Sequence, residues 1–220
     1  PGFITLSPPT GASNYGSAFL PAIYQGTPIG SSLRKGMEDS AAVSMPNLGN
    51  SKLSSERQRL QLDFARSLNQ GKLEQEIHNP EVEGLIESFE LAFRMQSEIP
   101  DLLDIDAETQ ATKSLYGIDN DATATFGRQC LMARRFAEAG VRFIEITHGS
   151  WDQHRNLEQA LRDNTAATDQ PIAALLTDLK QRDMLKDTLI VWTGEFGRTP
   201  YAQGEDGRDH NNKGFTAWMA

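Results

Sequence analysis

The chain has 220 residues, 38% of them hydrophobic and 23% charged, which is enough to bury one good core and is ordinary for a globular protein. A formal charge of −9 with no basic stripe to offset it argues against a nucleic-acid partner. The single cysteine, Cys130, excludes an internal disulfide, and its place in an apolar helical pattern favours a core residue over a nucleophile. No apolar run is long enough to span a membrane.

The first segment, residues 1–52, is rich in glycine, proline, serine and asparagine and predicts an irregular, loop-rich stretch. The sequence starts with Pro1 and stops at Ala220 within what reads as a strand, so we expect residues 1–220 to be a single truncated domain. A targeting segment could have preceded Pro1.

Residues 53–140 predict helices. Ser55 with Gln58 forms a capping-box pattern before a helix that could stop at Gly71. Asn79-Pro80 marks the start of a second helix, because asparagine is a good cap and proline suits the first turn. A third helix is expected from about Asp121 to Ala139, and the apolar stripes of all three indicate core packing.

The last segment, residues 141–220, changes character. Two β-rich runs, Val141–Thr147 and Thr188–Thr193, flank a long helical pattern that Pro171 is expected to divide into two helices. This order predicts a βαβ unit with two parallel, buried strands, and hence the α/β class.

Ligands collect at the carboxyl ends of parallel strands, so the residues after each predicted strand are the candidates for a site. Histidines and carboxylates gather there, within His148–His154, Gly194–Pro200 and Gly207–His210. Imidazole and carboxylate together favour zinc, manganese or iron over calcium as the divalent metal. The predicted metal ligands are Asp152, His154, Glu195, Asp209 and His210.

Two arginines in the same segments, Arg198 and Arg208, are predicted catalytic residues, because a guanidinium matches the oxygens of a tetrahedral anion. Structural roles remain open for three of the candidates. Asp152 could cap the following helix, Asp209 could be an Asx-turn residue, and Glu195 could form an ion pair with Arg198.

The segment Asp187–Pro200, followed by Gly207–His210, resembles a large bacterial family of uncharacterised sulfatase-like proteins of the alkaline phosphatase and sulfatase superfamily. Further stretches that fit this family are Phe19–Thr27, Glu90–Gln96, Gly140–Ile144 and Trp151–His154.

The resemblance implies a parallel-sheet, three-layer αβα sandwich. It also implies that Glu195 stands where sulfatases carry a metal-binding aspartate, and that Asp152, His154 and His210 match the metal ligands of alkaline phosphatases. A periplasmic or secreted location follows from the resemblance alone. Phe196 departs from the family pattern, because a histidine ligand is expected there.

The nucleophile that the resemblance implies has no counterpart in this sequence. No Cys-x-Pro-x-Arg motif is present, so the first strand and the nucleophile are expected upstream of Pro1, in a fragment that also lacks its C-terminal end.

The leading hypothesis is a metal-dependent hydrolase of sulfate or phosphate esters, acting on a small-molecule or glycan ester. The alternative is a non-catalytic sulfatase-fold module that binds a sulfated polysaccharide or a partner protein. A hydrolase or isomerase that uses metal-bound water alone would need no nucleophile. The sequence makes no prediction of oligomeric state.

Overall fold

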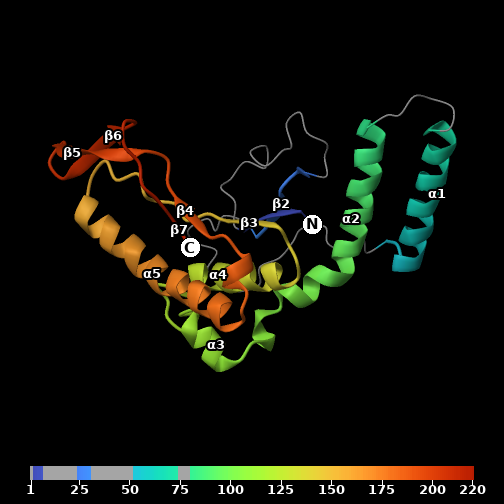
Figure 1. Ribbon diagram of the computed structural model, residues 1–220, viewed down its shortest axis with the longest axis horizontal. Helices are drawn as coiled ribbons and strands as arrows, with labels where there is room; N and C mark the ends of the chain where they lie inside the picture. Colours follow the sequence, from blue (N-terminus) through green and yellow to red (C-terminus); the bar gives the residue numbers. More distant parts are fainter. Residues whose placement is uncertain (1, 7–23, 31–51, 74–79) are drawn as a thin grey trace. The chain divides into compact units, whose positions relative to one another are not determined.

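The structure, a computed structural model, describes residues 2–6, 24–30, 52–73 and 80–220 (Figure 1). The chain divides into two compact units. The first contains Pro1–Asp104 and Ala139–Thr147, and the second contains Ile105–Glu138 and His148–Ala220. All the candidate site residues belong to the second unit.

The first unit contains a three-stranded parallel sheet, in which β1 (Phe3–Leu6) lies between β2 (Thr27–Ile29) and β3 (Phe143–Ile146). The side chains of β1 are fully buried after its first residue. The prediction of an irregular segment over residues 1–52 is therefore wrong for β1 and β2. Both strands have four residues or fewer, so the surrounding glycines, prolines and serines dominate the local composition.

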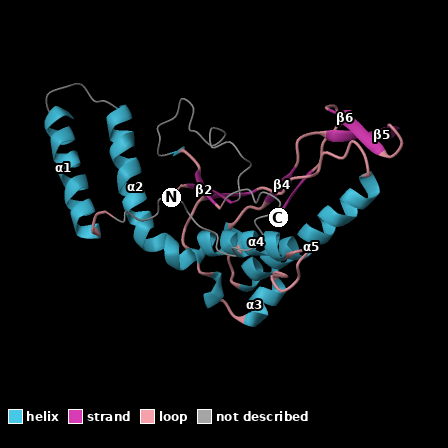
Figure 2. Cartoon of the chain, turned by 180° about the vertical axis from the view of Figure 1, so that it is seen from behind, coloured by secondary structure: helices cyan, strands magenta, loops and turns pink. Residues whose placement is uncertain are grey.

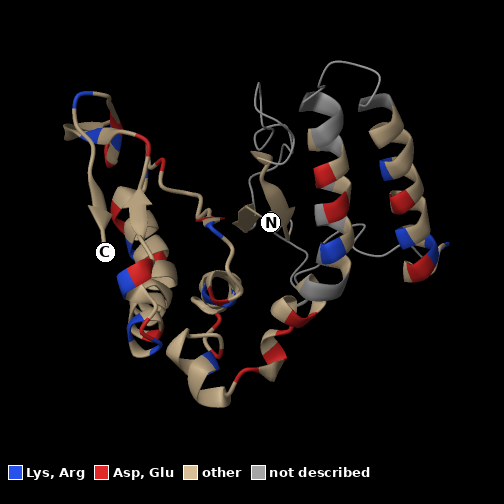
Figure 3. Cartoon of the chain, turned by 45° about the vertical axis from the view of Figure 1, so that its right-hand side comes forward, with Lys and Arg blue, Asp and Glu red and all other residues tan. Residues whose placement is uncertain are grey.

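Two helices of the first unit, α1 (Ser55–Leu73) and α2 (Pro80–Leu103), lie side by side (Figures 1 and 2). Arg59 of α1 links them through a hydrogen bond from Nη1 to Glu90 Oε2 of 2.8 Å. Figure 3 shows acidic and basic residues interspersed along α1. Both helices were predicted, but two details of α1 differ. Its cap is Ser54, whose hydroxyl oxygen accepts from the Arg57 amide, and not Ser55. Gly71, the predicted end of the helix, lies inside α1.

The second unit is built on two long helices, α4 (Ala124–Glu138) and α5 (Leu157–Gln181), which pack against each other. Three shorter elements accompany them: η3 (Ile105–Ala107), α3 (Gln110–Leu115) and η4 (Leu185–Asp187). Buried apolar side chains on α4 and α5 include Cys130, Leu131, Met132, Ala133, Phe136, Ala174 and Leu179. The predictions of a helix ending before Gly140 and of a buried Cys130 are confirmed.

The prediction that Pro171 divides the second long helix is wrong, because α5 continues through it. Proline removes one backbone donor from a helix interior and crowds the preceding turn. Pro171 is buried in this unit, so tertiary packing outweighs that local cost.

The strands of the second unit form two separate antiparallel pairs. β4 (Val191–Thr193) pairs with β7 (Ala217–Met219), and β5 (Gly197–Gln203) pairs with β6 (Gly207–Asn211). The β5–β6 hairpin reverses the chain between β4 and β7, so β7 returns beside β4 in the opposite direction (Figure 1).

The predicted βαβ unit and three-layer sandwich are therefore wrong. β3 belongs to the sheet of the first unit and β4 pairs with β7, so the two predicted strands do not share a sheet. The described residues contain one three-stranded parallel sheet, two two-stranded antiparallel sheets and five α-helices. Hydrophobic pattern located both strands but carried no information on their partners, which are set by contacts distant in sequence.

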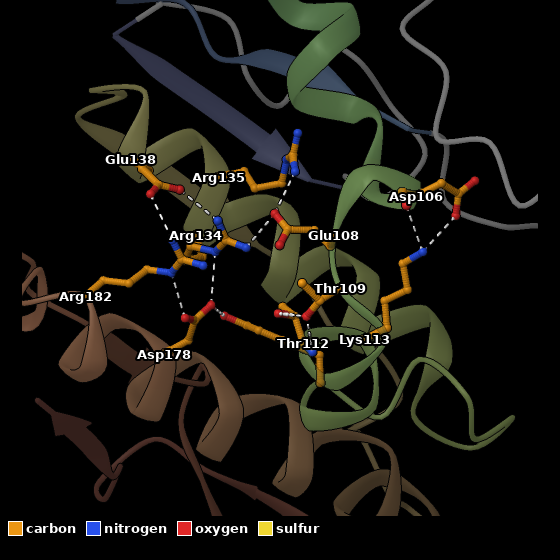
Figure 4. Close-up of polar contacts among 11 residues, drawn as sticks. Asp106, Glu108, Thr109, Thr112, Lys113, Arg134, Arg135, Glu138, Asp178 and Arg182 are labelled. Atoms are coloured by element: carbon orange, nitrogen blue, oxygen red, sulfur yellow. Dashed lines mark hydrogen bonds and ion pairs between the residues drawn. The ribbon is translucent and has the colours of Figure 1, made fainter.

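A buried arginine on α4 organises the helical part of the second unit (Figure 4). Arg134 is 2% exposed and faces three carboxylates. Its Nη2 lies 2.7 Å from Glu108 Oε1, its Nη1 lies 2.7 Å from Glu138 Oε2, and its Nε lies 3.0 Å from Asp178 Oδ2. These four residues, which we call the Arg134 cluster, tie α4 to α5 and to the segment after η3.

Asp178 of this cluster has two further partners. It accepts a hydrogen bond of 3.0 Å from the hydroxyl of the buried Tyr116 and one of 2.7 Å from Arg182 Nε. Burial, together with the nearby charge of Asp178, raises the pKa of Tyr116 above its ordinary value, so this phenol acts as a hydrogen-bond donor.

No helix among the described residues is long and apolar enough to cross a membrane.

Candidate metal centre

The first part of the site is the irregular segment between His148 and α5. Ser150 has a left-handed backbone, with φ of 67°, which turns the chain sharply. Its carbonyl accepts hydrogen bonds from Gln153 Nε2 at 2.6 Å and from Asn164 Nδ2 of α5 at 2.5 Å. Both amide side chains are buried, so this turn is fixed to the helix. Asp152 and His154 are thereby presented on a segment with defined backbone geometry.

The same segment is held against β6. The amide of Arg208 donates to the carbonyl of Gln153 at 3.1 Å, and the amide of Leu157 donates to the carbonyl of Asp206 at 3.3 Å. Gly207 permits this contact, because a Cβ there would overlap with the carbonyl group of His154. A glycine is therefore required where the hairpin meets the ligand-bearing segment.

The hairpin places His210 beside Arg198 through an irregular register. Arg198 pairs with His210 and Ala202 pairs with Arg208, so β5 carries four steps where β6 carries two. The buried hydroxyl of Thr199 holds this bulge by accepting from the Asp209 amide at 3.1 Å and donating to the Tyr201 carbonyl at 2.8 Å.

Three predicted ligands come together, and we call them the metal triad: Asp152, His154 and His210. Asp152 Oδ1 lies 2.9 Å from His154 Nε2 and 3.0 Å from His210 Nε2, and the two Nε2 atoms lie 3.1 Å apart. An ion about 2.1 Å from each ligand atom fits above such a triangle. All three side chains are partly solvent-exposed, so further coordination positions would face solvent.

The charges around the triad keep its carboxylate ionised. The hydrogen bonds from His210 and from Arg198 hold the pKa of Asp152 below its ordinary value. An ionised carboxylate is the form that binds a metal ion.

The two predicted catalytic arginines differ in their surroundings. Arg198 Nη1 lies 2.6 Å from Asp152 Oδ1, and its Nη2 lies 3.0 Å from Glu195 Oε1. Arg198 therefore contacts the metal triad directly. The side chain of Arg208 donates to the carbonyl of its neighbour Gly207 at 3.1 Å.

The two other predicted ligands have contacts of their own. Glu195 forms the ion pair with Arg198 that the sequence left open, and Asp209 Oδ1 accepts a hydrogen bond of 2.7 Å from the amide of His210. Neither belongs to the group of ligand atoms that lie within 4.8 Å of one another.

Several residues that build the site were not predicted. They are Gln203, which bonds to His154, and Thr199, Asn164 and Gly207, which fix the backbone. Uncharged residues of these types are common in loops and hairpins, and none carries a spacing that marks it as part of a site. Thr199 and Gly207 lie inside the segments that the sequence singled out, but neither was predicted as a site residue.

A third histidine, His148, belongs to an aromatic cluster beside the site. Its ring lies edge-on to Phe126 and Trp151, with centroid distances of 5.3 and 5.8 Å. Its Nδ1 accepts a hydrogen bond of 3.1 Å from Trp151 Nε1, which requires an unprotonated Nδ1. Burial lowers the pKa of His148, so the folded protein favours the neutral imidazole.

We expect His148 to make the protein less stable in acid. The unfolded chain takes up the proton near the ordinary histidine pKa of about 6.5, whereas the folded protein takes it up only at lower pH. Stability from this group is therefore complete above about pH 6.5 and is lost as the pH falls below it. Urea unfolding at several pH values should show a smaller acid-induced loss for His148→Phe than for the wild type. An equal loss in both proteins would contradict this assignment.

The chain belongs to the family described as protein of unknown function DUF1501, whose model matches residues 1–220. Nothing in this match links the chain to the sulfatase superfamily, so the resemblance to sulfatase-like proteins stated above is corrected here. No curated protein and no solved structure matches the chain. The periplasmic or secreted location stays a prediction.

Proposed function

We propose that this protein binds one divalent metal ion, of zinc, manganese or iron, through the metal triad and hydrolyses a phosphate or sulfate ester. The observation that carries the proposal is the convergence of Asp152 Oδ1, His154 Nε2 and His210 Nε2 within 3.1 Å of one another. Two imidazoles and one carboxylate are a ligand set that suits these metals.

Each residue has a defined task in this proposal. Asp152, His154 and His210 would hold the ion, which would supply Lewis-acid activation of a water molecule near neutral pH. Arg198, which lies 2.6 Å from Asp152, binds the anionic oxygens of the ester. In the hydrolysis, the water oxygen would form a bond to phosphorus or sulfur while the bond to the ester oxygen breaks. The proton that the water gives up would pass, through solvent, to the leaving oxygen. No protein nucleophile is required.

Hydrolysis by the purified protein tests the proposal. We expect turnover of an aryl phosphate or an aryl sulfate that depends on added zinc, manganese or iron and disappears with a chelator. His210→Ala should remove it, and Arg198→Ala should lower kcat by about 10²-fold, the loss typical of one charge-stabilising donor. Arg162→Ala is the matched control, because Arg162 forms an exposed ion pair with Glu158 one turn away on α5.

Two outcomes would contradict the proposal in different ways. Bound metal without turnover of either ester would favour the non-catalytic binding module. If the protein binds none of the three metals, hydrogen bonds and ion pairs alone hold the triad together.

A further inference from the structure

The last residue of β5, Gln203, contacts one member of the metal triad, His154, on the side of its ring that faces away from the other two ligands. Its side-chain oxygen Oε1 lies 2.5 Å from His154 Nδ1, which is the ring nitrogen that does not face Asp152 and His210. His154 therefore has one nitrogen directed at the other ligands and one directed at Gln203.

The contact is a consequence of the hairpin register. Gln203 pairs with Gly207 across the β5–β6 hairpin, and Gly207 is the residue against which the backbone of His154 packs. The absence of a side chain at Gly207 lets His154 approach the hairpin closely enough for its ring to reach Gln203. The two partners are 49 residues apart in sequence, so only the folded protein brings them together.

The chemistry of this pair determines which nitrogen of His154 is free. An amide oxygen can only accept a hydrogen bond, so Nδ1 must carry the proton. In a neutral imidazole, Nε2 then holds a lone pair directed toward Asp152 Oδ1 and His210 Nε2. Metal-binding histidines commonly have such a partner on their other nitrogen, which fixes the ring and its tautomer.

We propose that Gln203 is the positioning residue of the metal centre, which selects the Nδ1-protonated tautomer of His154 and directs Nε2 at the ion. This inference rests on the proposed metal site. It gives Gln203 a role in metal affinity although Gln203 is not itself a ligand.

Metal titration of three variants tests the role. Gln203→Leu removes the acceptor, and we expect metal affinity to fall about 10- to 100-fold, the usual loss for such a partner. Gln203→Glu keeps an acceptor and should retain or increase the affinity. Gln159→Leu is the control, because Gln159 is an exposed glutamine of α5 whose side chain bonds to Asp163. An unchanged affinity in Gln203→Leu would overturn the proposal.

The tautomer of His154 gives a second readout that a merely structural role would not change. Long-range ¹H–¹⁵N spectra of the metal-free protein should show a protonated Nδ1 in the wild type and a loss of this preference in Gln203→Leu. If the wild type binds no metal, the proposed function fails, whereas the spectra still decide whether Gln203 orients His154. The same tautomer in both proteins would overturn the role of Gln203 alone.

Discussion

We expect Arg134→Met to lower the free energy of unfolding by about 3–5 kcal/mol, the usual cost of removing one partner of a buried ion pair. Glu108 and Asp178 are 12% and 8% exposed, so both would remain largely buried after losing this cation. Methionine fills most of the space of the arginine stem, which makes the charge the main quantity that changes. Urea unfolding followed by circular dichroism measures the loss.

The control for this prediction is Arg162→Met. Arg162 also pairs with a glutamate one turn away, but both side chains are at least 70% exposed. Exposed pairs of this kind contribute about 0.3–0.5 kcal/mol. Similar losses in Arg134→Met and Arg162→Met would show that the Arg134 cluster contributes no more than a surface ion pair.

A double-mutant cycle with Asp178→Leu isolates one contact of the cluster. After Arg134 is removed, Asp178 keeps Tyr116 and the partly exposed Arg182 as partners. The loss in the double variant should be smaller than the sum of the two single losses, because both single changes remove the same contact between Arg134 and Asp178. If the two single losses of unfolding free energy add up to the loss in the double variant, Arg134 stabilises the protein through contacts other than the one with Asp178.

The helices were predictable because their signal is local. Apolar residues at three- and four-residue spacing, together with Asn79-Pro80 and Gly140, indicate where α2 begins and where α4 ends. The Arg134 cluster was not predicted, although two of its members, Arg134 and Glu138, lie on α4. Its members are separated by as many as 70 residues in sequence (Glu108 and Asp178), and a helix pattern does not indicate which polar side chain is buried.

The pairing of the strands was harder to predict, because paired strands are distant from each other in sequence. β1 has four residues and its neighbour β3 begins at Phe143, so nothing local indicates that they pair. The metal triad was nevertheless among the predicted ligands. Its residue types are distinctive, and all three residues lie in the segments that follow the two predicted strands, even though the predicted sheet was wrong. The uncharged Gln203 has no such signature.

The second large effect that we expect is stabilisation by the metal ion itself. The folded protein brings His210 within 3.0 Å of Asp152, 58 residues earlier in the chain, whereas the unfolded chain does not hold the ligands together. An ion that binds only the folded form raises the free energy of unfolding by about 2.7 kcal/mol at one hundred times its Kd. Thermal or urea unfolding with zinc, manganese or iron(II) should show this increase.

His210→Ala separates binding at the triad from binding elsewhere. The side chain of His210 is 43% exposed, so its removal should cost little stability in the absence of metal. Added metal should then no longer stabilise the protein. Calcium is the control ion, because it prefers oxygen ligands and should stabilise the wild type much less. His210 is one of the three ligands of the triad, so its removal should weaken metal binding there strongly. Equal stabilisation of the wild type and His210→Ala would therefore show that the ion binds at another place.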